Sequence, residues 1–434
     1  MLERTTRGDL TMRYLYSALL YCLLPLMVVR LLWRSRRVPG YRRRLGERFG
    51  VYSREPPSGR PVIWVHAVSV GEVAASAPLV ERLLAEYPQG AIVVTTTTPT
   101  GSDRVRAIFG ERVTHVYCPW DLPGAVNRFL RWARPDVLLL VETELWPNLL
   151  YLARATGCRT ALVNARLSSR SAARYTRLAG FSHWLVGQLD AIACRSEIDS
   201  ERFLALGAPE DRVLVSGNLK WDAGLEPGVR ARGEQLRAEN AGRQVLLAAS
   251  THPGEEGQVI EAWQSVAQNC PGCGLVLVPR HPERAVDVAA LCRAKGLNVV
   301  PLSDGPLGEV DFDVLLGDTL GDLPALYAIA TVAFIGGSLV PVGGHNPVEA
   351  SLWEVPVVSG PHIRNFEDTY GVLSAVGAVE VVENSSALGG AVRRLLDDPV
   401  RRADMAGAAM GVVRENRGAL ERVLALVAVL AARA

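Results

Sequence analysis

Val62-Ile-Trp-Val-His66-Ala-Val-Ser69-Val-Gly-Glu72 begins the pattern that decides the fold: a short apolar run, a polar loop and then a helical segment. The same alternation recurs along the chain. The further apolar runs are 91–95, 113–117, 137–141, 160–164, 191–194 and 213–216, followed by 244–249, 275–279, 298–301, 314–316, 332–336, 356–359 and 379–382. Strand, crossover helix and strand in this order predict an α/β protein with parallel sheets covered on both faces.

A polar stretch interrupts this rhythm at 221–243, and 434 residues are too many for one ordinary core. We therefore predict two Rossmann-like lobes, at 38–220 and 244–434, joined by a linker at 221–243. The final apolar helix, near 420–432, is expected to pack back on the body. Sheets of this kind bind ligands beyond the carboxyl ends of their strands, so two such lobes would leave a cleft lined by loops that follow strands.

The composition, with 49% hydrophobic and 21% charged residues, excludes a disordered or fibrous protein. The net charge of +2 says little by itself, but arginines are dense within the first fifty residues. Seven scattered cysteines, an odd number, indicate a reducing compartment and therefore lobes that face the cytoplasm. The clustered arginines are Arg34, Arg36, Arg37, Arg42, Arg43, Arg44 and Arg48.

The segment 14–33 is apolar apart from Ser17 and Arg30, and it is long enough to span a membrane as a helix. Its tyrosines and Trp33 also suit an interfacial position. We predict an uncleaved membrane anchor over 1–37 at the cell inner membrane, since the arginines that follow mark the cytoplasmic side. The alternative is a buried amphipathic helix of the first lobe. In both cases the basic stretch could meet anionic headgroups or an anionic lipid substrate.

Acidic side chains follow two predicted strands of the first lobe. Glu72 lies three residues after Ser69, which is the spacing of a capping box, so one interpretation is a helix cap. The other is a general base, because the positive end of a helix keeps a carboxylate ionised and able to accept a proton from a hydroxyl. Glu142 directly follows the run 137–141 and would be costly there unless it is solvated or paired. We expect Glu142 to point at a substrate.

Lys220 follows the last strand of the first lobe, where a cation could lie near the negative charge of a departing nucleotide. The alternative is an ordinary surface lysine. Lys220 and Lys295 are the only lysines among 47 basic residues. We infer that lysine is retained where a compact ammonium works better than a planar guanidinium.

The second lobe has four polar or glycine-rich loops after strands, and together they indicate a nucleotide site. In the last of them, Asn346 is the expected helix N-cap, Pro347 the first helical residue and Glu349 the third. Asp311-Phe-Asp313 matches a metal-binding D-x-D motif but falls at the start of a strand, on the wrong edge of the sheet, so we predict no metal site. The loops are 250–256, 279–284, 317–322 and 336–349.

Eight motifs, in order and over nearly the whole chain, resemble the family of 3-deoxy-D-manno-octulosonic acid (Kdo) transferases, which are GT-B glycosyltransferases. They are Val-Ser-Val-Gly-Glu72, Thr-Thr-Thr-Thr-Pro-Thr-Gly101, Glu142-Thr-Glu-Leu-Trp-Pro-Asn148, Asn164-Ala-Arg-Leu-Ser168, Gly-Asn-Leu-Lys220, Pro279-Arg-His-Pro-Glu-Arg284, Gly-Asp-Thr-Leu-Gly321 and Gly-Gly-His-Asn-Pro-Val-Glu349.

The resemblance implies transfer of Kdo from CMP-Kdo to lipid IVA, with no cofactor and no nucleic acid partner. Glu72 then corresponds to the general base, and Glu142 and Lys220 to residues that support the transition state. Ala67 stands where we expect a serine, and Asp322 where we expect a glutamate. The positions that correspond to CMP contacts are Pro279, Arg280, Leu320, Gly321, Asp322, Asn346, Pro347, Val348 and Glu349.

Two other functions remain open at this point. One is a GT-B enzyme that uses a UDP-sugar, such as a lipid-A-disaccharide synthase. The other is a catalytically silent membrane scaffold, which would tolerate the loss of Glu72.

Overall fold

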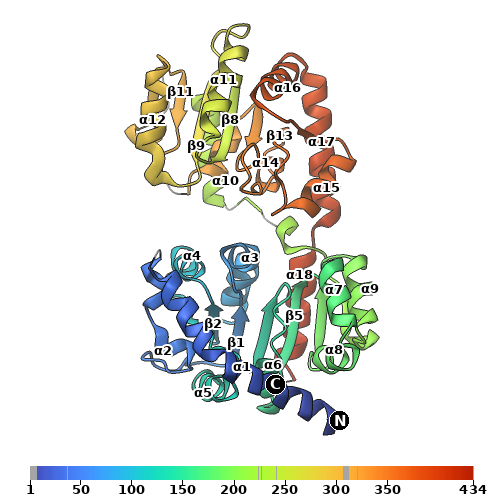
Figure 1. Cartoon of the computed structure of the whole chain (residues 1–434). Helices are drawn as coiled ribbons and strands as arrows, with labels where there is room; N and C mark the ends of the chain where they lie inside the picture. Colours follow the sequence, from blue (N-terminus) through green and yellow to red (C-terminus); the bar gives the residue numbers. More distant parts are fainter. Residues whose placement is uncertain are drawn as a thin grey trace. The chain divides into compact units, whose positions relative to one another are not determined.

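The computed structural model describes residues 7–36, 38–222, 224–225, 227–240, 242–305, 312–319 and 321–433. The chain forms two compact units. The first comprises Met1–Asp222 and Asn416–Ala434, and the second comprises Ala223–Glu415. Each unit is a parallel sheet with helices on both faces (Figure 1), which confirms the predicted fold class.

In the described part of the first unit, seven parallel strands lie in the order β3-β2-β1-β4-β5-β6-β7. The strands are β1 (Val62–His66), β2 (Ala91–Thr96), β3 (Thr114–Tyr117), β4 (Val137–Val141), β5 (Arg159–Ala165), β6 (Ala191–Cys194) and β7 (Val213–Val215). The helices are α1 (Arg7–Arg34), η1 (Pro39–Arg42), α2 (Leu45–Arg48), α3 (Val70–Glu86), α4 (Pro99–Phe109), α5 (Pro123–Ala133), α6 (Pro147–Ala155), α7 (Ser169–Thr176), α8 (Ala179–Val186), α9 (Glu197–Ala205), η2 (Glu210–Arg212), η3 (Leu219–Asp222) and α18 (Ala419–Ala431).

The second unit repeats this design, and its described strands lie in the order β10-β11-β9-β8-β12-β13-β14. They are β8 (Val245–Thr251), β9 (Gly274–Pro279), β10 (Val299–Pro301), β11 (Val314–Leu316), β12 (Val332–Ile335), β13 (Val357–Ser359) and β14 (Val379–Val381). Its helices are α10 (Pro227–Glu239), α11 (Glu256–Ala267), η4 (Pro282–Arg284), α12 (Ala285–Ala294), η5 (Leu302–Asp304), α13 (Leu323–Leu326), η6 (Tyr327–Ile329), α14 (Val348–Ser351), α15 (Glu367–Ala375), α16 (Ser385–Asp397) and α17 (Pro399–Asn416).

Burial on both faces of the sheet explains why the strands are continuous apolar runs. In β1, Val62 and Trp64 belong to the core on one face, and Ile63 and Val65 belong to the core on the other. Side chains alternate across a strand, so a strand covered by helices on both sides needs apolar residues at every position. The predicted strands therefore form within two residues of their expected ends.

Strand order places a topological switch point in each sheet. In the first unit the chain moves outward from β1 through β2 to β3 and then returns to the other side of β1 as β4. In the second unit β8 plays the part of β1, with β9 on one side and β12 on the other. Loops that leave two such neighbouring strands separate in opposite directions, which opens the crevice where these folds bind ligands.

The C-terminal helix α18 belongs to the first unit, whereas the sequence boundary had assigned residues up to 434 to the second lobe. Its face formed by Val423, Leu424 and Val427 joins the core that covers β1 and β4, and Figure 1 shows it beside β5. Asp222 fixes its start, because the carboxylate accepts hydrogen bonds of 2.6 Å from the N–H groups of Gly418 and Leu420. The segment predicted as a linker contains α10, which packs against α13 and η6.

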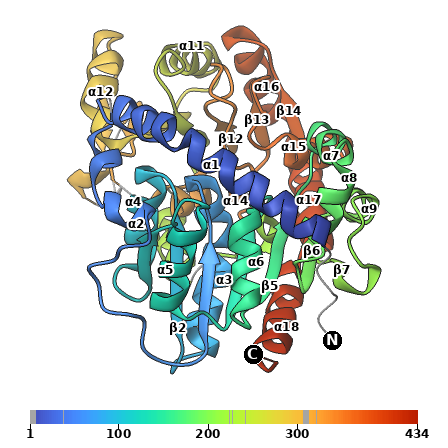
Figure 2. The same cartoon turned by 60° about the horizontal axis from the view of Figure 1, so that its bottom comes forward.

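Helix α1 lies across α6 and α8 of the first unit (Figure 2). Its part Thr11–Arg34 is long and apolar enough to cross a membrane, and only 11% of the most apolar window is buried. Large apolar side chains on its outer side are exposed, including Leu15 (62%), Leu19 (57%) and Leu26 (64%). The helix is therefore not the buried core helix that was the alternative interpretation.

Candidate active site

The first switch point is occupied by the loop that carries Glu72. Ser69 caps α3, since its hydroxyl accepts from the Glu72 N–H at 3.3 Å, and it also donates to Glu72 Oε1 at 2.8 Å. The second carboxylate oxygen, Oε2, accepts from the Val68 N–H at 2.7 Å. The predicted capping box is thus present, and it holds the Glu72 carboxylate beside the end of β1.

The environment of Glu72 differs from that of an ordinary cap. Burial raises its pKa to about 7, against the effect of the two hydrogen bonds, and the negative charges of Glu144 and Glu142 raise it further. A second capping box, Ser196 and Asp199 at the start of α9, has the same two bonds between the serine and the acidic residue, but the other Asp199 oxygen accepts from the Leu167 N–H at 2.8 Å. Asp199 also faces Arg195 and Arg202 at 3.5 and 4.0 Å. Glu72 forms no ion pair within the part of the chain that the structure describes.

Glu142 leaves β4 on the other side of the first switch point. Its φ of +62° lies in the left-handed region that residues other than glycine seldom adopt. The Glu142 N–H still bonds to Val163 O at 3.0 Å, so the strand ends directly at this residue. Strained backbone of this kind is common where a side chain must be aimed at a ligand. Nearby, burial raises the pKa of Glu144, which accepts from the Trp146 indole at 2.8 Å.

Lys220 lies in η3, a short turn held against the end of β5. Asn164, at the end of that strand, has a φ of +53° and is fully buried, and its Oδ1 accepts from the Leu219 N–H at 3.1 Å. The Lys220 N–H in turn donates to Asn218 Oδ1 at 3.1 Å. Asn164 therefore positions the turn that carries Lys220, a role that the motif containing Asn164 did not reveal.

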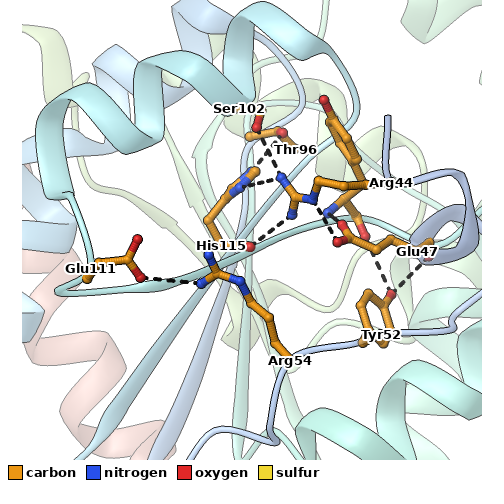
Figure 3. Close-up of polar contacts among 9 residues, drawn as sticks. Arg44, Glu47, Tyr52, Arg54, Thr96, Ser102, Glu111 and His115 are labelled. Atoms are coloured by element: carbon orange, nitrogen blue, oxygen red, sulfur yellow. Dashed lines mark hydrogen bonds and ion pairs between the residues drawn. The ribbon is translucent and has the colours of Figure 1, made fainter. Parts of the chain in front are cut away.

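The arginine-rich segment divides its side chains between two environments. Arg44 turns inward to Glu47, Ser102 and His115 (Figure 3), and Arg48 lies over the ring of Tyr117. The burial of His115 and the charge of Arg44 lower the pKa of this histidine to about 3. The outward-facing arginines are Arg34, Arg36, Arg42 and Arg43.

Arg48 also links this segment to the loop of Glu72. Its guanidinium donates to Thr97 O at 2.9 Å, and the Thr97 N–H donates to Val68 O at 3.2 Å. Val68 is the residue whose own N–H binds the Glu72 carboxylate. Among the described arginines of this segment, only the outward-facing ones are therefore free of these buried contacts, and Arg37 lies outside the described residues.

In the second unit, the predicted nucleotide contacts lie on loops that follow β9, β11 and β12. Arg280 directly follows β9, and Asp322 precedes α13 and accepts from the Thr319 hydroxyl. Asn346 Oδ1 accepts from the Val348 N–H at 3.1 Å. Leu320 lies outside the described residues. Helix α14 starts one residue later than predicted and has only four residues.

Glu255, which no local sequence pattern singles out, lies inside the glycine-rich loop after β12. Its side chain is fully buried, and it accepts hydrogen bonds of 2.7–3.0 Å from the N–H groups of Gly337, Ser338 and Leu339, with a further 3.2 Å bond from His252 N–H. Burial raises its pKa, although these four donors favour the ionised carboxylate. The N–H groups of Gly337, Ser338 and Leu339 are therefore already in use and are not free to bind a phosphate.

No group of three or more metal-binding side chains occurs among the described residues. Asp313 accepts from the Asn298 N–H at 2.8 Å, while Asp311 lies outside the described residues. The carboxylate of Asp313 is therefore engaged at the start of its strand.

The fold defined by these two units is that of GT-B glycosyltransferases. A solved glycosyltransferase structure from Rickettsia africae has the same fold, with a TM-score of 0.54 at 14% identity over 87% of this chain and 99% of that one. The family model described as 3-deoxy-D-manno-octulosonic-acid transferase (kdotransferase) matches residues 43–223.

Two relatives cover almost the full length. The 3-deoxy-D-manno-octulosonic acid transferase of Haemophilus influenzae is 39% identical over 95% of this chain and 97% of its own length. The enzyme of the same name from Bordetella pertussis is 37% identical over 95% and 98%. This chain belongs to the Kdo transferase family.

Proposed function

We propose that this chain transfers Kdo from CMP-Kdo to lipid IVA with inversion, as a step in lipopolysaccharide biosynthesis. The observation that carries the proposal is the state of Glu72, a half-buried carboxylate at a switch point with a pKa of about 7, which forms no ion pair with any described residue. A general base is most effective when its pKa lies near the working pH. The capping box of α9 has the same bond between serine and carboxylate, yet its acidic residue faces two arginines.

In the proposed reaction Glu72 takes the proton of the primary hydroxyl of the acceptor, and the oxygen forms a bond to the anomeric carbon of Kdo. The bond between that carbon and the phosphate oxygen breaks, and its electron pair stays on CMP. Direct displacement by an oriented hydroxyl needs no covalent intermediate. Glu142 and Lys220 are proposed to support the charges that develop in the transition state.

The donor nucleotide is proposed to bind the loops of the second unit without a metal ion. Arg280 offers a cation, and Asn346 and Glu349 offer groups for hydrogen bonds to the nucleotide. The full set proposed to bind CMP is Pro279, Arg280, Leu320, Gly321, Asp322, Asn346, Pro347, Val348 and Glu349.

We further propose that α1 lies in the interface of the cell inner membrane rather than crossing it. Two of its polar residues, Arg13 and Ser17, face the protein: Ser17 donates to Asn148 Oδ1 at 3.1 Å, and Arg13 lies 4.2 Å from the centre of the Tyr151 ring. Asp121 accepts from the hydroxyl of Tyr16 and binds the start of α6. A helix tied to the first unit in this way, with apolar side chains outward, suits the boundary between headgroups and acyl chains.

Nucleotide selectivity tests the proposed donor. A ligand that binds the folded state raises the melting temperature according to its concentration relative to Kd. CMP is expected to raise the melting temperature by several degrees at a concentration where UMP and UDP have little effect. Stabilisation by UDP but not by CMP would contradict the proposal and would favour a UDP-sugar enzyme.

A further inference from the structure

Two histidines bridge the switch point of the second unit. His252 follows β8 and His345 lies in the loop after β12, the two strands that flank this point. Their Nε2 atoms are 2.9 Å apart, the ring centroids are 5.1 Å apart, and the ring planes differ by 5°. The rings therefore lie edge to edge in one plane and share one hydrogen bond across the crevice.

Local backbone geometry holds the pair in place. Ser250, just before His252, has a φ of +58°, and the pairing of β8 with β9 shifts register between Ala249 and Thr251. Such bulges redirect the side chains that follow them. On the other side, Gly337 has a φ of +66°, and a side chain there would lie 3.1 Å from His345 Nε2 and 3.3 Å from His252 Cδ2. The two rings thus rest on the loop that Glu255 fills.

A hydrogen bond between two Nε2 atoms fixes the positions of the protons. One ring must donate and the other must accept, so in the neutral pair one ring has a bare Nδ1 and the other has Nδ1–H. Neither Nδ1 has a hydrogen-bond partner within the part of the chain that the structure describes. A proton added to the bare Nδ1 would give the pair one positive charge and two N–H donors that do not face each other.

The charges around the pair favour the neutral state when no ligand is bound. Burial, followed by the neighbouring His252 and the charge of Arg280, lowers the pKa of His345 to about 4. The pKa of His252 is also lowered, by burial first and then by His281, Arg280 and Arg284, while Glu256 opposes this shift. Glu256 is itself paired with Arg284 at 2.6 Å. An anion placed beside the rings would raise their pKa and favour protonation of the pair.

We propose that His252 and His345 together form the oxyanion-binding element of the donor site, and that the pair takes up one proton from solvent when the donor nucleotide binds. This inference rests on the proposed CMP-sugar donor. Its main support is that the two rings meet at the switch point, where Glu255 already occupies the N–H groups of Gly337, Ser338 and Leu339. Those three N–H groups therefore do not bind the anion. When Kdo leaves, the phosphate of CMP gains a negative charge, and a protonated pair would stabilise it.

Calorimetry of CMP binding at pH 7.5, in two buffers that differ in ionisation enthalpy, measures this proton directly. We expect uptake of close to one proton per CMP bound. The donor has two oxyanions, the phosphate and the Kdo carboxylate. CMP contains only the phosphate and CMP-Kdo contains both, so comparing the two ligands distinguishes the two groups. Uptake with CMP assigns the pair to the phosphate, whereas uptake with intact CMP-Kdo alone assigns it to the carboxylate. Uptake with neither ligand overturns the proposal, and this measurement on the native protein needs no variant.

Variants provide the second measurement. His252→Gln and His345→Gln should each abolish proton uptake and weaken binding of the assigned ligand about 10- to 100-fold, the range for loss of a hydrogen bond to a charged group. His183→Gln, at an exposed histidine of α8 in the first unit, is the matched control and should bind normally. Normal uptake by both crevice variants would overturn the proposal. If CMP fails to bind and UDP binds instead, the proposed donor fails, and the proton count with UDP decides the histidine proposal separately.

Discussion

At the scale of single residues, the main question is whether Glu72 is more than a helix cap. The structure is consistent with both interpretations, because the Glu72 carboxylate closes a capping box and burial also raises its pKa to about 7. We expect Glu72→Gln to lower kcat about 10²- to 10⁴-fold, the usual contribution of a general base, with CMP affinity unchanged. Steady-state kinetics and CMP titration measure the two effects.

Asp199→Asn is the control, since Asp199 closes a second capping box with the same bonds to its serine. It should lower the melting temperature, because Arg195 and Arg202 lose a negatively charged neighbour, but it should keep turnover per folded molecule. If the two variants show the same kinetic loss, Glu72 acts only as a cap.

The pH dependence of both activity and stability follows from the raised pKa of Glu72. The base must be ionised, so kcat/KM should rise with pH and level off above about 7. A carboxyl group whose folded pKa exceeds its unfolded value stabilises the protein at low pH, and this contribution disappears as pH rises through the folded pKa. At pH 8, Glu72→Gln should therefore melt no lower than the native protein. A kcat/KM profile that is flat from pH 5.5 to 8.5 would contradict the assignment.

The two lysines offer a comparison within one chain. Lys220 lies in a turn positioned by Asn164, whereas Lys295 ends α12 and pairs with Glu261 at 3.7 Å on the surface. We expect Lys220→Arg to lower kcat strongly while CMP binding changes little, because a planar guanidinium does not replace a compact ammonium close to reacting groups. Lys295→Arg should have no effect. Near-normal kinetics for both variants would remove Lys220 from the mechanism.

Local signals in the sequence predicted some of these residues and could not predict others. The spacing of Ser69 and Glu72 identifies a capping box because both partners lie within one turn. No local signal identifies Glu255, because its carboxylate binds the N–H groups of Gly337, Ser338 and Leu339, which are more than eighty residues away in sequence. The pairing of His252 with His345 depends on strand order in the same way.

At the scale of elements, α1 gives the clearest prediction. Replacing the exposed Leu19 and Leu26 together with glutamate should reduce binding to anionic lipid vesicles at least about tenfold, because each leucine is worth about 1.5–3 kcal/mol when buried in an apolar phase. Val286→Glu with Val400→Glu, at exposed positions of the second unit, is the control for the added charge. Sedimentation with vesicles measures binding. Equal binding by both double variants would exclude α1 as the membrane contact.

The strands were the most predictable elements, because runs buried on both faces are apolar throughout. The destination of α18 was less predictable. Its apolar face shows that one side of the helix is buried, but the sequence does not say against which unit. In the structure α18 belongs to the first unit, and Asp222 of that unit binds the N-terminus of the helix. The orientation of the arginines in the arginine-rich segment was equally hard to predict. Only the structure shows that Arg44 and Arg48 point inward while the other described arginines of the segment point outward.

At the scale of the whole molecule, the two units have sheets of the same design but different proposed roles in the reaction. The first unit contains the proposed base and the helix proposed to lie in the membrane, and the second contains the loops proposed for the nucleotide. The fold class follows from the alternation of strands and helices alone. The reaction does not, because GT-B folds serve many donors and acceptors, and the particular residues at the switch points must decide it.

The most direct test of this account is the mass of the lipid product. Purified protein is incubated with CMP-Kdo and lipid IVA in the presence of EDTA, and the lipid is examined by mass spectrometry. We predict that lipid IVA gains the mass of one or more Kdo residues, that CMP is released in equal amount, and that Glu72→Gln leaves the lipid unmodified. Lipid IVA that gains no mass, with or without added magnesium, while a UDP-sugar is transferred instead, would contradict the central claim.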